Sequence, residues 1–76
     1  MTDFVVMFTK HFGIEPSDYK PELTYNDVAD WDSLAHMAIV AEMEEAHDIE
    51  FEVDEISEMT SAGRMLEILT TKIKEA

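Results

Sequence analysis

The stretch DSLAHMAIVAEMEEAH, residues 32–47, decides the fold predicted for this chain. It contains no glycine or proline, and its apolar residues return at intervals of three and four positions, which is typical of an amphipathic helix. An acid and a serine stand directly before this pattern, and both residue types are favoured at helix starts. We therefore expect a helix that starts near Ser33 and ends around His47 or Asp48.

This helix has apolar residues on two opposite sides. At about 100° per residue, Ile39, Val40 and Met43 point in one direction and form the expected core stripe. The opposite side carries Leu34, Met37, Ala38 and Ala41, followed by Glu45. A helix in so small a domain buries only one side, so we expect the second set to stay in water. An exposed apolar patch beside acids indicates a docking surface, although residues chosen for helix propensity would give a similar pattern.

The remaining chain predicts three further helices. Three phenylalanines recur every fourth position between residues 3 and 12, which predicts a helix that stops at Gly13. A short helix is expected over 54–59 with Asp54 as its N-cap, and a longer one from residue 60 or 61 to about 74. A long connection with both prolines joins the first two helices. The predicted fold class is all-α, a small four-helix bundle with three longer helices and a short third one.

Apolar residues outside the second helix complete the expected core. The long loop should be pinned to the helices by Ile14, Leu23, Val28 and Trp31. The segment after the second helix reads as an extended connector that buries Phe51 and Val53. In the last helix, the positions expected to face the core are Ala62, Met65, Leu66, Leu69 and Ile73.

Length and charge narrow the possible functions. The 76 residues suffice for a single domain, 1–76, with a small core. Eighteen acids against five basic residues give a net charge of −13, which speaks against nucleic acid and predicts partners with basic surfaces. There is no cysteine, no apolar run near the roughly 20 residues that span a bilayer, and no basic N-terminal signal. We expect a cytoplasmic monomer that does not enter membranes.

Metal sites fit the sequence poorly. Neither Asp27 nor Asp30 begins a calcium-binding loop, because the alternating oxygen ligands and the central glycine are missing. Two histidines on the second helix, His36 and His47, are about 16 Å apart at 1.5 Å per residue and cannot share a zinc ion. We expect these two, with His11, to be half-buried at the edge of the core.

Ser33 raises a separate question, because a serine at a helix start is often only a cap. Asp32 is an equally good cap and would leave the Ser33 hydroxyl free in the first turn, where a phosphate ester would be stabilised. A catalytic pair of Ser33 with His36 is not expected, because His36 projects toward the core and no glycine-rich oxyanion loop accompanies it. We expect no catalytic residues and a protein that is not an enzyme.

Three segments together resemble the acyl carrier proteins over nearly the whole chain. They are DSL at residues 32–34, MEEAHDIEF at 43–51 and FEVDEISEMTSAGRMLEIL at 51–69. The resemblance implies that a separate phosphopantetheinyl transferase attaches 4′-phosphopantetheine from coenzyme A to Ser33. The thiol of that group would carry acyl intermediates as thioesters, which would supply the thiol that this chain lacks.

The resemblance also implies a surface for partner enzymes on the second helix. The matching positions are Asp32, Leu34, Met37, Ala41, Glu44 and Glu45. Expected partners are acyl- or aminoacyl-loading, condensing and tailoring enzymes with basic docking surfaces. Ala35 and Ala38 stand where carrier proteins of fatty acid synthesis commonly have acids, and WDSL followed by His36 looks more like the stand-alone carriers of specialised biosynthetic pathways. The alternative is an unmodified acidic adaptor that binds basic proteins through the same helix.

Overall fold

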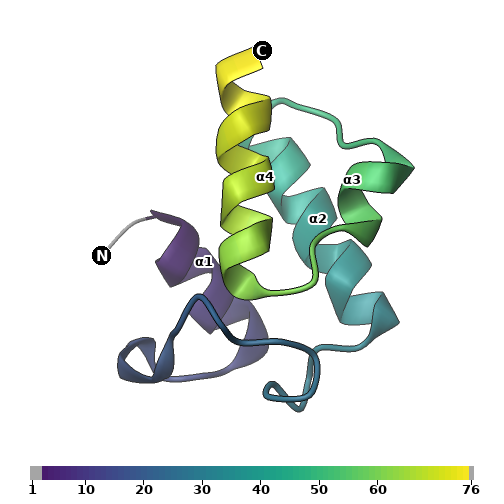
Figure 1. The fold of residues 1–76 in the computed structure, drawn as a ribbon. Coiled ribbons are helices and arrows are strands. Elements are labelled where there is room, and N and C mark those ends of the chain that lie inside the picture. The colour runs from purple at the N-terminus through teal and green to yellow at the C-terminus, as the bar shows by residue number, and fades with distance from the viewer. Residues whose placement is uncertain (1–2, 76) are drawn as a thin grey trace.

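The structure, a computed structural model, describes residues 3–75, so the outermost residues of the predicted domain 1–76 lie outside the described part. The described chain folds into helices joined by loops (Figure 1). They are α1 (Asp3–Phe12), the 3-10 helix η1 (Pro16–Asp18), α2 (Ser33–His47), α3 (Val53–Ser57) and α4 (Ala62–Glu75). No residue within 3–75 lies in a strand, and the predicted four-helix, all-α fold is confirmed.

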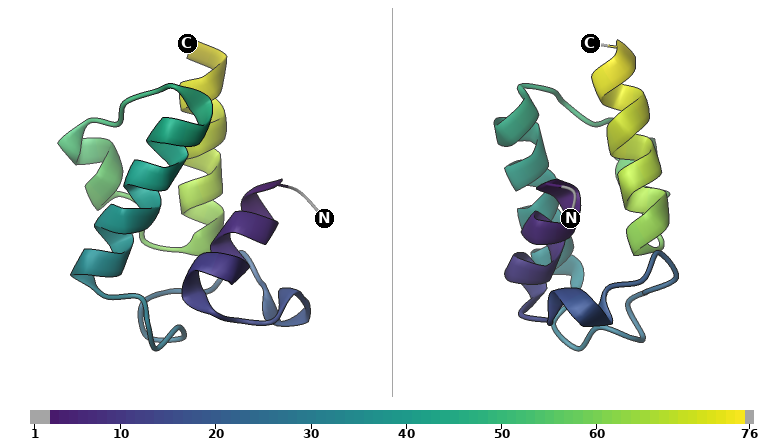
Figure 2. Two further views of the ribbon diagram at one scale, coloured as in Figure 1. Left: turned by 180° about the vertical axis from the view of Figure 1, so that it is seen from behind. Right: turned by 90° about the vertical axis from the view of Figure 1, so that its left-hand side faces the viewer.

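The helices α1, α2 and α4 form the body of the bundle, and the short α3 lies beside α2 (Figures 1 and 2). The long connection between α1 and α2 crosses the bundle at the end where α2 and α4 begin, and this position is the same in all three views. The loop contains η1, which the sequence did not predict. The start of α2 therefore lies beside the loop that precedes it.

Local backbone chemistry sets the ends of the helices. Gly13 has a φ of 66°, in the left-handed region that glycine adopts without strain, and it ends α1 as predicted. The Asp32 side chain accepts a hydrogen bond from the amide of Ala35 at 2.8 Å and caps α2, also as predicted. Asp48 ends α2 in the left-handed region, with a φ of 53°. The observed span of α2 therefore agrees with the predicted one.

The core is a cluster of aromatic, aliphatic and methionine side chains that all the helices except η1 reach. Its fully buried members include Phe8, Ile39, Val40, Met43, Met59 and Met65. Trp31 and Val28 are buried and pin the long loop, as predicted, while Ile14 and Leu23 are partly buried against the same cluster. The Trp31 ring lies 5.5 Å from Phe8 and 5.4 Å from Phe12, measured between ring centroids.

The start of α3 differs from the prediction. Glu52, and not Asp54, is the N-cap residue, and the Glu55 side chain accepts a hydrogen bond from the Glu52 amide at 2.7 Å. Glu52 and Glu55 form a capping box, in which the third residue of the helix bonds back to the N-cap residue. The helix therefore begins at Val53, one residue before Asp54. Val53 then falls on the exposed side and is 77% exposed, so its predicted burial was wrong.

Two further burial predictions were wrong at the end of the bundle where α2 and α4 end. Ile73 is 40% exposed, because the last turn of α4 extends beyond the neighbouring helices (Figures 1 and 2). His47 is exposed as well, and Ile49 in the following connector is the buried residue in this region. In α4, Ile68 is buried at a position that the sequence analysis did not include.

Candidate functional site

Ser33 is the first residue of α2, and its side chain is exposed. The capping interaction at this end is made by Asp32, whose carboxylate accepts from the Ala35 amide. Within residues 3–75, no hydrogen bond involves the Ser33 hydroxyl. The serine that the sequence singled out is therefore an accessible hydroxyl at the positive end of the α2 dipole.

A groove of about 420 Å³ opens beside this serine. It lies between the start of α2 and the helix α3, with one aromatic side chain from the long loop at its edge. The residues that line it are Tyr25, Asp32, Ser33, His36, Met37, Ile56 and Ser57. An attached group at Ser33 would have this groove directly beside it.

His36 lies in this groove and joins three segments of the chain. The Trp31 indole N–H donates to Nδ1 of His36 at 2.9 Å. An indole nitrogen is only a donor, so Nδ1 must accept and the ring proton of a neutral imidazole is on Nε2. Nε2 lies 3.1 Å from the carbonyl oxygen of Ile56 and donates to it. The ring is only 7% exposed and ties the long loop, α2 and α3 together, which confirms the predicted position at the core edge.

The second apolar side of α2 is exposed, as the sequence predicted. Leu34 is 83% exposed and Met37 is 52% exposed, although both are residues that are usually buried. Ala38, Ala41 and Glu45 on the same helix are also exposed. A patch of large apolar side chains in water next to the Ser33 groove has the composition of an interaction surface.

Comparison with known proteins gives one kind of match. No protein-family model matches the sequence, and a search of curated proteins finds no significant match. Among solved structures, the chain is similar to the holo acyl carrier protein from Geobacter metallireducens, with a TM-score of 0.82 and 24% sequence identity. The similarity covers 95% of this chain and 83% of that one. The chain has the acyl carrier protein fold.

Within the acyl carrier fold, Glu44 has a contact that the sequence analysis missed. Its carboxylate accepts a hydrogen bond from the backbone amide of Phe51 at 2.8 Å, and its side chain is partly buried. This contact holds the connector against the last turn of α2. Glu45, the next residue, is exposed. The two adjacent acids therefore differ, because Glu44 accepts a hydrogen bond within the domain and Glu45 faces solvent.

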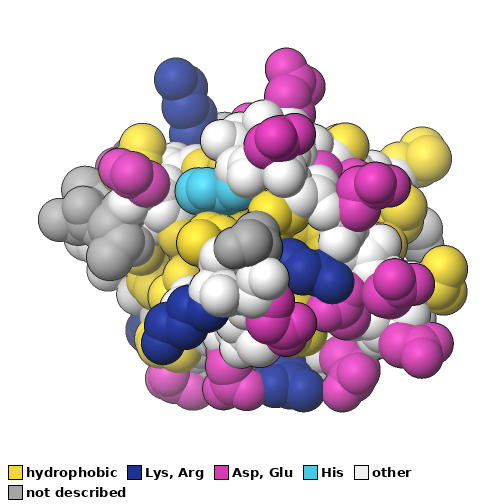
Figure 3. Space-filling view, turned by 90° about the horizontal axis from the view of Figure 1, so that it is seen from above, with side chains coloured by type: hydrophobic (Ala, Val, Ile, Leu, Met, Phe, Trp, Pro, Cys, Tyr) yellow, Lys and Arg dark blue, Asp and Glu magenta, His cyan; other side chains and the backbone are white. Residues whose placement is uncertain are grey.

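Acidic side chains are spread over the face of the molecule shown in Figure 3. Lys72 pairs with Glu55 at 2.9 Å, and Arg64 pairs with Glu58 and Glu67, so ion pairs within residues 3–75 occupy two of the five basic residues. The Glu52 amide and the Lys72 ammonium, in that order of importance, lower the pKa of Glu55. The negative charge that remains is available to partners with basic surfaces.

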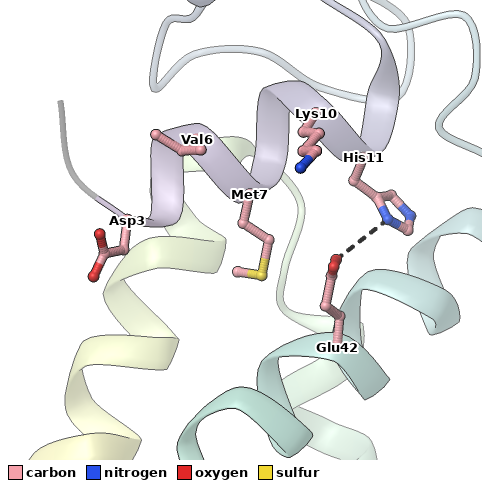
Figure 4. A pocket seen from close by; sticks show the side chains of 6 residues that line it. All are labelled: Asp3, Val6, Met7, Lys10, His11 and Glu42. Carbon is pink, nitrogen blue, oxygen red and sulfur yellow. Dashed lines mark ion pairs between the residues drawn. The ribbon is translucent and has the colours of Figure 1, made fainter.

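A second groove, of about 530 Å³, lies between α1 and α2 (Figure 4). His11 of α1 lies over α2, with Nδ1 3.5 Å from a carboxylate oxygen of Glu42 and Nε2 3.2 Å from the carbonyl oxygen of Ala35. The groove shares no lining residue with the Ser33 groove. Its polar contacts join the two helices, and it is part of the packing between them.

Three residues of the Ser33 groove were not predicted. Tyr25 comes from the long loop, and Ile56 and Ser57 come from α3. No periodic pattern places these segments near α2, because their positions follow from tertiary packing.

Over residues 3–75, no three His, Asp or Glu side chains gather closely enough to hold a metal ion. None of the described helices combines the length and the apolar character needed to cross a bilayer.

Proposed function

We propose that this protein is a carrier that holds acyl or related intermediates as thioesters on a 4′-phosphopantetheine group attached to Ser33. The observation that carries the proposal is the exposed Ser33 hydroxyl at the start of α2 in an acyl carrier fold. Asp32 supplies the helix cap, so attachment at Ser33 removes no contact on which the helix depends. The hydroxyl oxygen would attack the phosphorus that bears the pantetheine in coenzyme A and form the phosphodiester. The P–O bond of the pyrophosphate bridge would break, the adenosine part would leave with the other phosphate, and the hydroxyl proton would pass to a base of the transferase.

The residues around Ser33 fit such a group. The amino end of α2 favours a negatively charged phosphate, because the backbone amides of the first turn and the helix dipole are directed toward it. The groove beside the serine offers apolar contacts from Met37 and Ile56 and polar ones from Tyr25 and Ser57. When bound, the group supplies a thiol, which this chain does not contain.

We propose that partner enzymes dock on the exposed side of α2. Leu34, Met37 and Ala41 supply apolar contacts, and Asp32 and Glu45 supply carboxylates at the two ends of that side. Glu44 adds negative charge next to Glu45, although its carboxylate also accepts a hydrogen bond from the Phe51 amide in the connector. The partners would be a phosphopantetheinyl transferase and the loading, condensing and tailoring enzymes of a specialised pathway, all with basic docking surfaces.

The attachment is tested by mass. Purified protein is incubated with coenzyme A, Mg²⁺ and a broad-specificity phosphopantetheinyl transferase, and its intact mass is measured. We expect one phosphopantetheine per chain on the unaltered protein and on Ser17→Ala, a control at an exposed serine of η1 outside the groove. We expect none on Ser33→Ala. No gain on the unaltered protein, or the same gain on Ser33→Ala, would contradict the proposal.

Docking is tested by reversing charge. Glu45→Lys should slow association with a partner and reduce the salt dependence of binding, because exposed charges act mainly on the association rate. If the protein is instead an acidic adaptor, it would bind its partners equally well with and without a group on Ser33, and equally well as the Ser33→Ala variant. Binding that ignores the state of Ser33 would therefore favour the adaptor.

A further inference from the structure

We propose that Met37 is an oxidation site, and that its conversion to the sulfoxide weakens docking on the exposed side of α2. This inference rests on the proposed function, because it concerns the surface on which partner enzymes would bind. It depends on three features of Met37: its exposure compared with the other methionines, its place among apolar residues, and its position on the side of α2 away from the core.

Exposure separates the methionines of this chain. Met37 is 52% exposed. The completely buried methionines are Met43, Met59 and Met65. Met7 is partly buried and points from α1 into the groove between α1 and α2 (Figure 4). A thioether is oxidised only where the oxidant reaches its sulfur, so among the methionines that the structure describes Met37 should react first.

The oxidant that suits this site is a small, uncharged peroxide such as hydrogen peroxide. The Met37 sulfur attacks one peroxide oxygen, an S–O bond forms and the O–O bond breaks, and the other oxygen leaves as hydroxide and takes up the proton to become water. The sulfur gives up two electrons and the peroxide receives them, so atoms and electrons balance. The net charge of −13 repels anionic oxidants from the surface and leaves an uncharged peroxide unaffected.

The sulfoxide would change the character of the exposed side of α2. Met37 stands there among apolar residues, with Leu34 83% exposed one turn before it and Ala38 and Ala41 exposed after it. Oxidation places a strong hydrogen-bond acceptor within this patch. A partner that covers the patch with apolar side chains offers the acceptor no donor while removing its water, which lowers the affinity.

Oxidation at this position spares the fold. Met37 lies on the side of α2 opposite to Ile39, Val40 and Met43, which are completely or almost completely buried. An added oxygen on its sulfur therefore meets solvent and displaces no core side chain. The three buried methionines can be reached only when the domain opens. Mild oxidation would thus alter the docking surface while the bundle keeps its structure.

Selectivity is tested by mass. The protein is treated with hydrogen peroxide, and fragment spectra of its proteolytic peptides give the oxidation rate of each methionine. Met37 should gain one oxygen at least about tenfold faster than the three buried methionines, because they react only after the fold opens. The protein oxidised at Met37 should melt within about 2 °C of the parent. Buried methionines that react as fast as Met37, or a larger fall in melting temperature, would contradict the proposal.

Docking is measured with a synthetic amphipathic helix that has leucines on one side and lysines on the other. This peptide represents a partner with an apolar and basic surface. The oxidised protein should bind it at least about fivefold more weakly than the parent, because an acceptor is buried without a donor. The sulfoxide carries no net charge, so the salt dependence of binding should stay the same. Equal affinities before and after oxidation would overturn the proposal.

Three variants assign the effect to position 37. Met37→Leu keeps an apolar side chain that peroxide does not oxidise, so peroxide should leave its affinity unchanged. Met7→Leu removes the partly buried methionine and should lose affinity on oxidation as the parent does. Met37→Gln carries a permanent polar group and should bind as weakly as the oxidised parent. A loss in Met37→Leu, no loss in Met7→Leu, or full affinity in Met37→Gln would each overturn the proposal.

A final arm separates this inference from the proposed function. The initial rate of phosphopantetheine attachment is measured on the parent, on the oxidised protein, and after methionine sulfoxide reductases have restored the thioether. The rate should fall on oxidation and recover as the sulfoxide is removed. No attachment to the parent would contradict the proposed function, while the peptide still decides the effect of Met37. Attachment at the same rate in all three states would contradict the oxidation inference alone.

Discussion

The amide nitrogen of Gly63 lies 2.8 Å from the carbonyl oxygen of Pro21. The next amide toward the N-terminus, that of Ala62, donates to the carbonyl of Leu23 at 2.9 Å. The first amides of a helix have no partners within it, and here the long loop supplies them. A Cβ atom on Gly63 would lie 2.9 Å from the Cβ atom of Pro21, so only glycine permits this approach without a shift. The loop is therefore fixed at both the aromatic core and the start of α4.

Gly63→Ala should destabilise the protein. The new methyl group forces Pro21 away and weakens the bond to its carbonyl, at a cost of about 1–3 kcal/mol. The higher helix propensity of alanine offsets up to about 1 kcal/mol of this. Urea denaturation, followed by Trp31 fluorescence, should show a net loss on the order of 1 kcal/mol. Thr70→Ala, on an exposed part of the same helix, should change the free energy of unfolding by less than about 0.5 kcal/mol. Equal midpoints for the two variants would contradict the close contact.

His36→Leu should be among the most destabilising single changes in the domain. It leaves the Trp31 indole N–H without its acceptor, at a cost of about 1–3 kcal/mol. It also removes one donor to the Ile56 carbonyl, which keeps the Met59 amide at 3.2 Å. This loss is a substantial part of the total stability of a small domain, so the melting temperature should fall steeply. His36→Gln keeps one acceptor and one donor and should recover part of the loss. A Leu variant as stable as the Gln variant would show that the two hydrogen bonds contribute little.

Glu44→Ala should lower stability, whereas Glu45→Ala should not. The first removes a charged acceptor from the Phe51 amide, and such bonds are worth about 1.5–3 kcal/mol, while the second changes an exposed side chain. Hydrogen exchange at the Phe51 amide should accelerate only in the Glu44 variant. Glu44→Gln, which keeps an acceptor oxygen, should lie between the two. Similar exchange rates in all three variants would contradict the role assigned to Glu44.

The contribution of Glu55 to stability should depend on pH. Its pKa is lower in the folded protein than its ordinary value of 4.5, first because of the Glu52 amide and then because of Lys72. The folded state therefore favours the ionised form, which stabilises the protein above that value and is lost as the pH falls through the lowered pKa. Glu55→Gln keeps the capping acceptor and removes the charge. The difference in melting temperature between the parent and this variant should be largest near pH 7 and shrink below pH 4.5.

Glu55→Gln also controls for the general effect of acid. Protonation of the many other carboxylates reduces the repulsion that comes from a net charge of −13, and this happens equally in both proteins. Only the difference between them reports on Glu55 and its contact with Lys72 at 2.9 Å. A difference that stays constant from pH 7 to pH 3 would show that the ionic contact with Lys72 does not stabilise the folded state.

Helix positions could be predicted well from the sequence because their signals are local. The spacing of the phenylalanines in α1, the cap at Asp32 and the stop at Gly13 depend only on neighbouring residues, and all three agree with the structure. The exposure of Leu34 followed from a simple argument about volume, since a small domain cannot bury both sides of α2. These features do not depend on how distant segments meet.

The remaining features depend on contacts between distant segments. No rule of spacing joins Trp31 to His36 and then to the carbonyl of Ile56, and the sequence therefore located His36 without identifying its partners. Val53 was misplaced because the sequence analysis read it as the buried end of an extended connector. The cap at Glu52 instead makes Val53 the first residue of α3, where its side chain is 77% exposed.

The division of roles between Asp32 and Ser33 has a consequence for the attachment that we propose at Ser33. Because the Asp32 side chain caps α2, Ser33 can be unmodified, esterified or replaced while the first turn of α2 keeps its structure. If the proposed function holds, each partner enzyme would then bind the same folded surface, and only the group attached to Ser33 would differ. Asp32→Ala would couple these two properties, because the first turn would depend on whatever group Ser33 happened to hold.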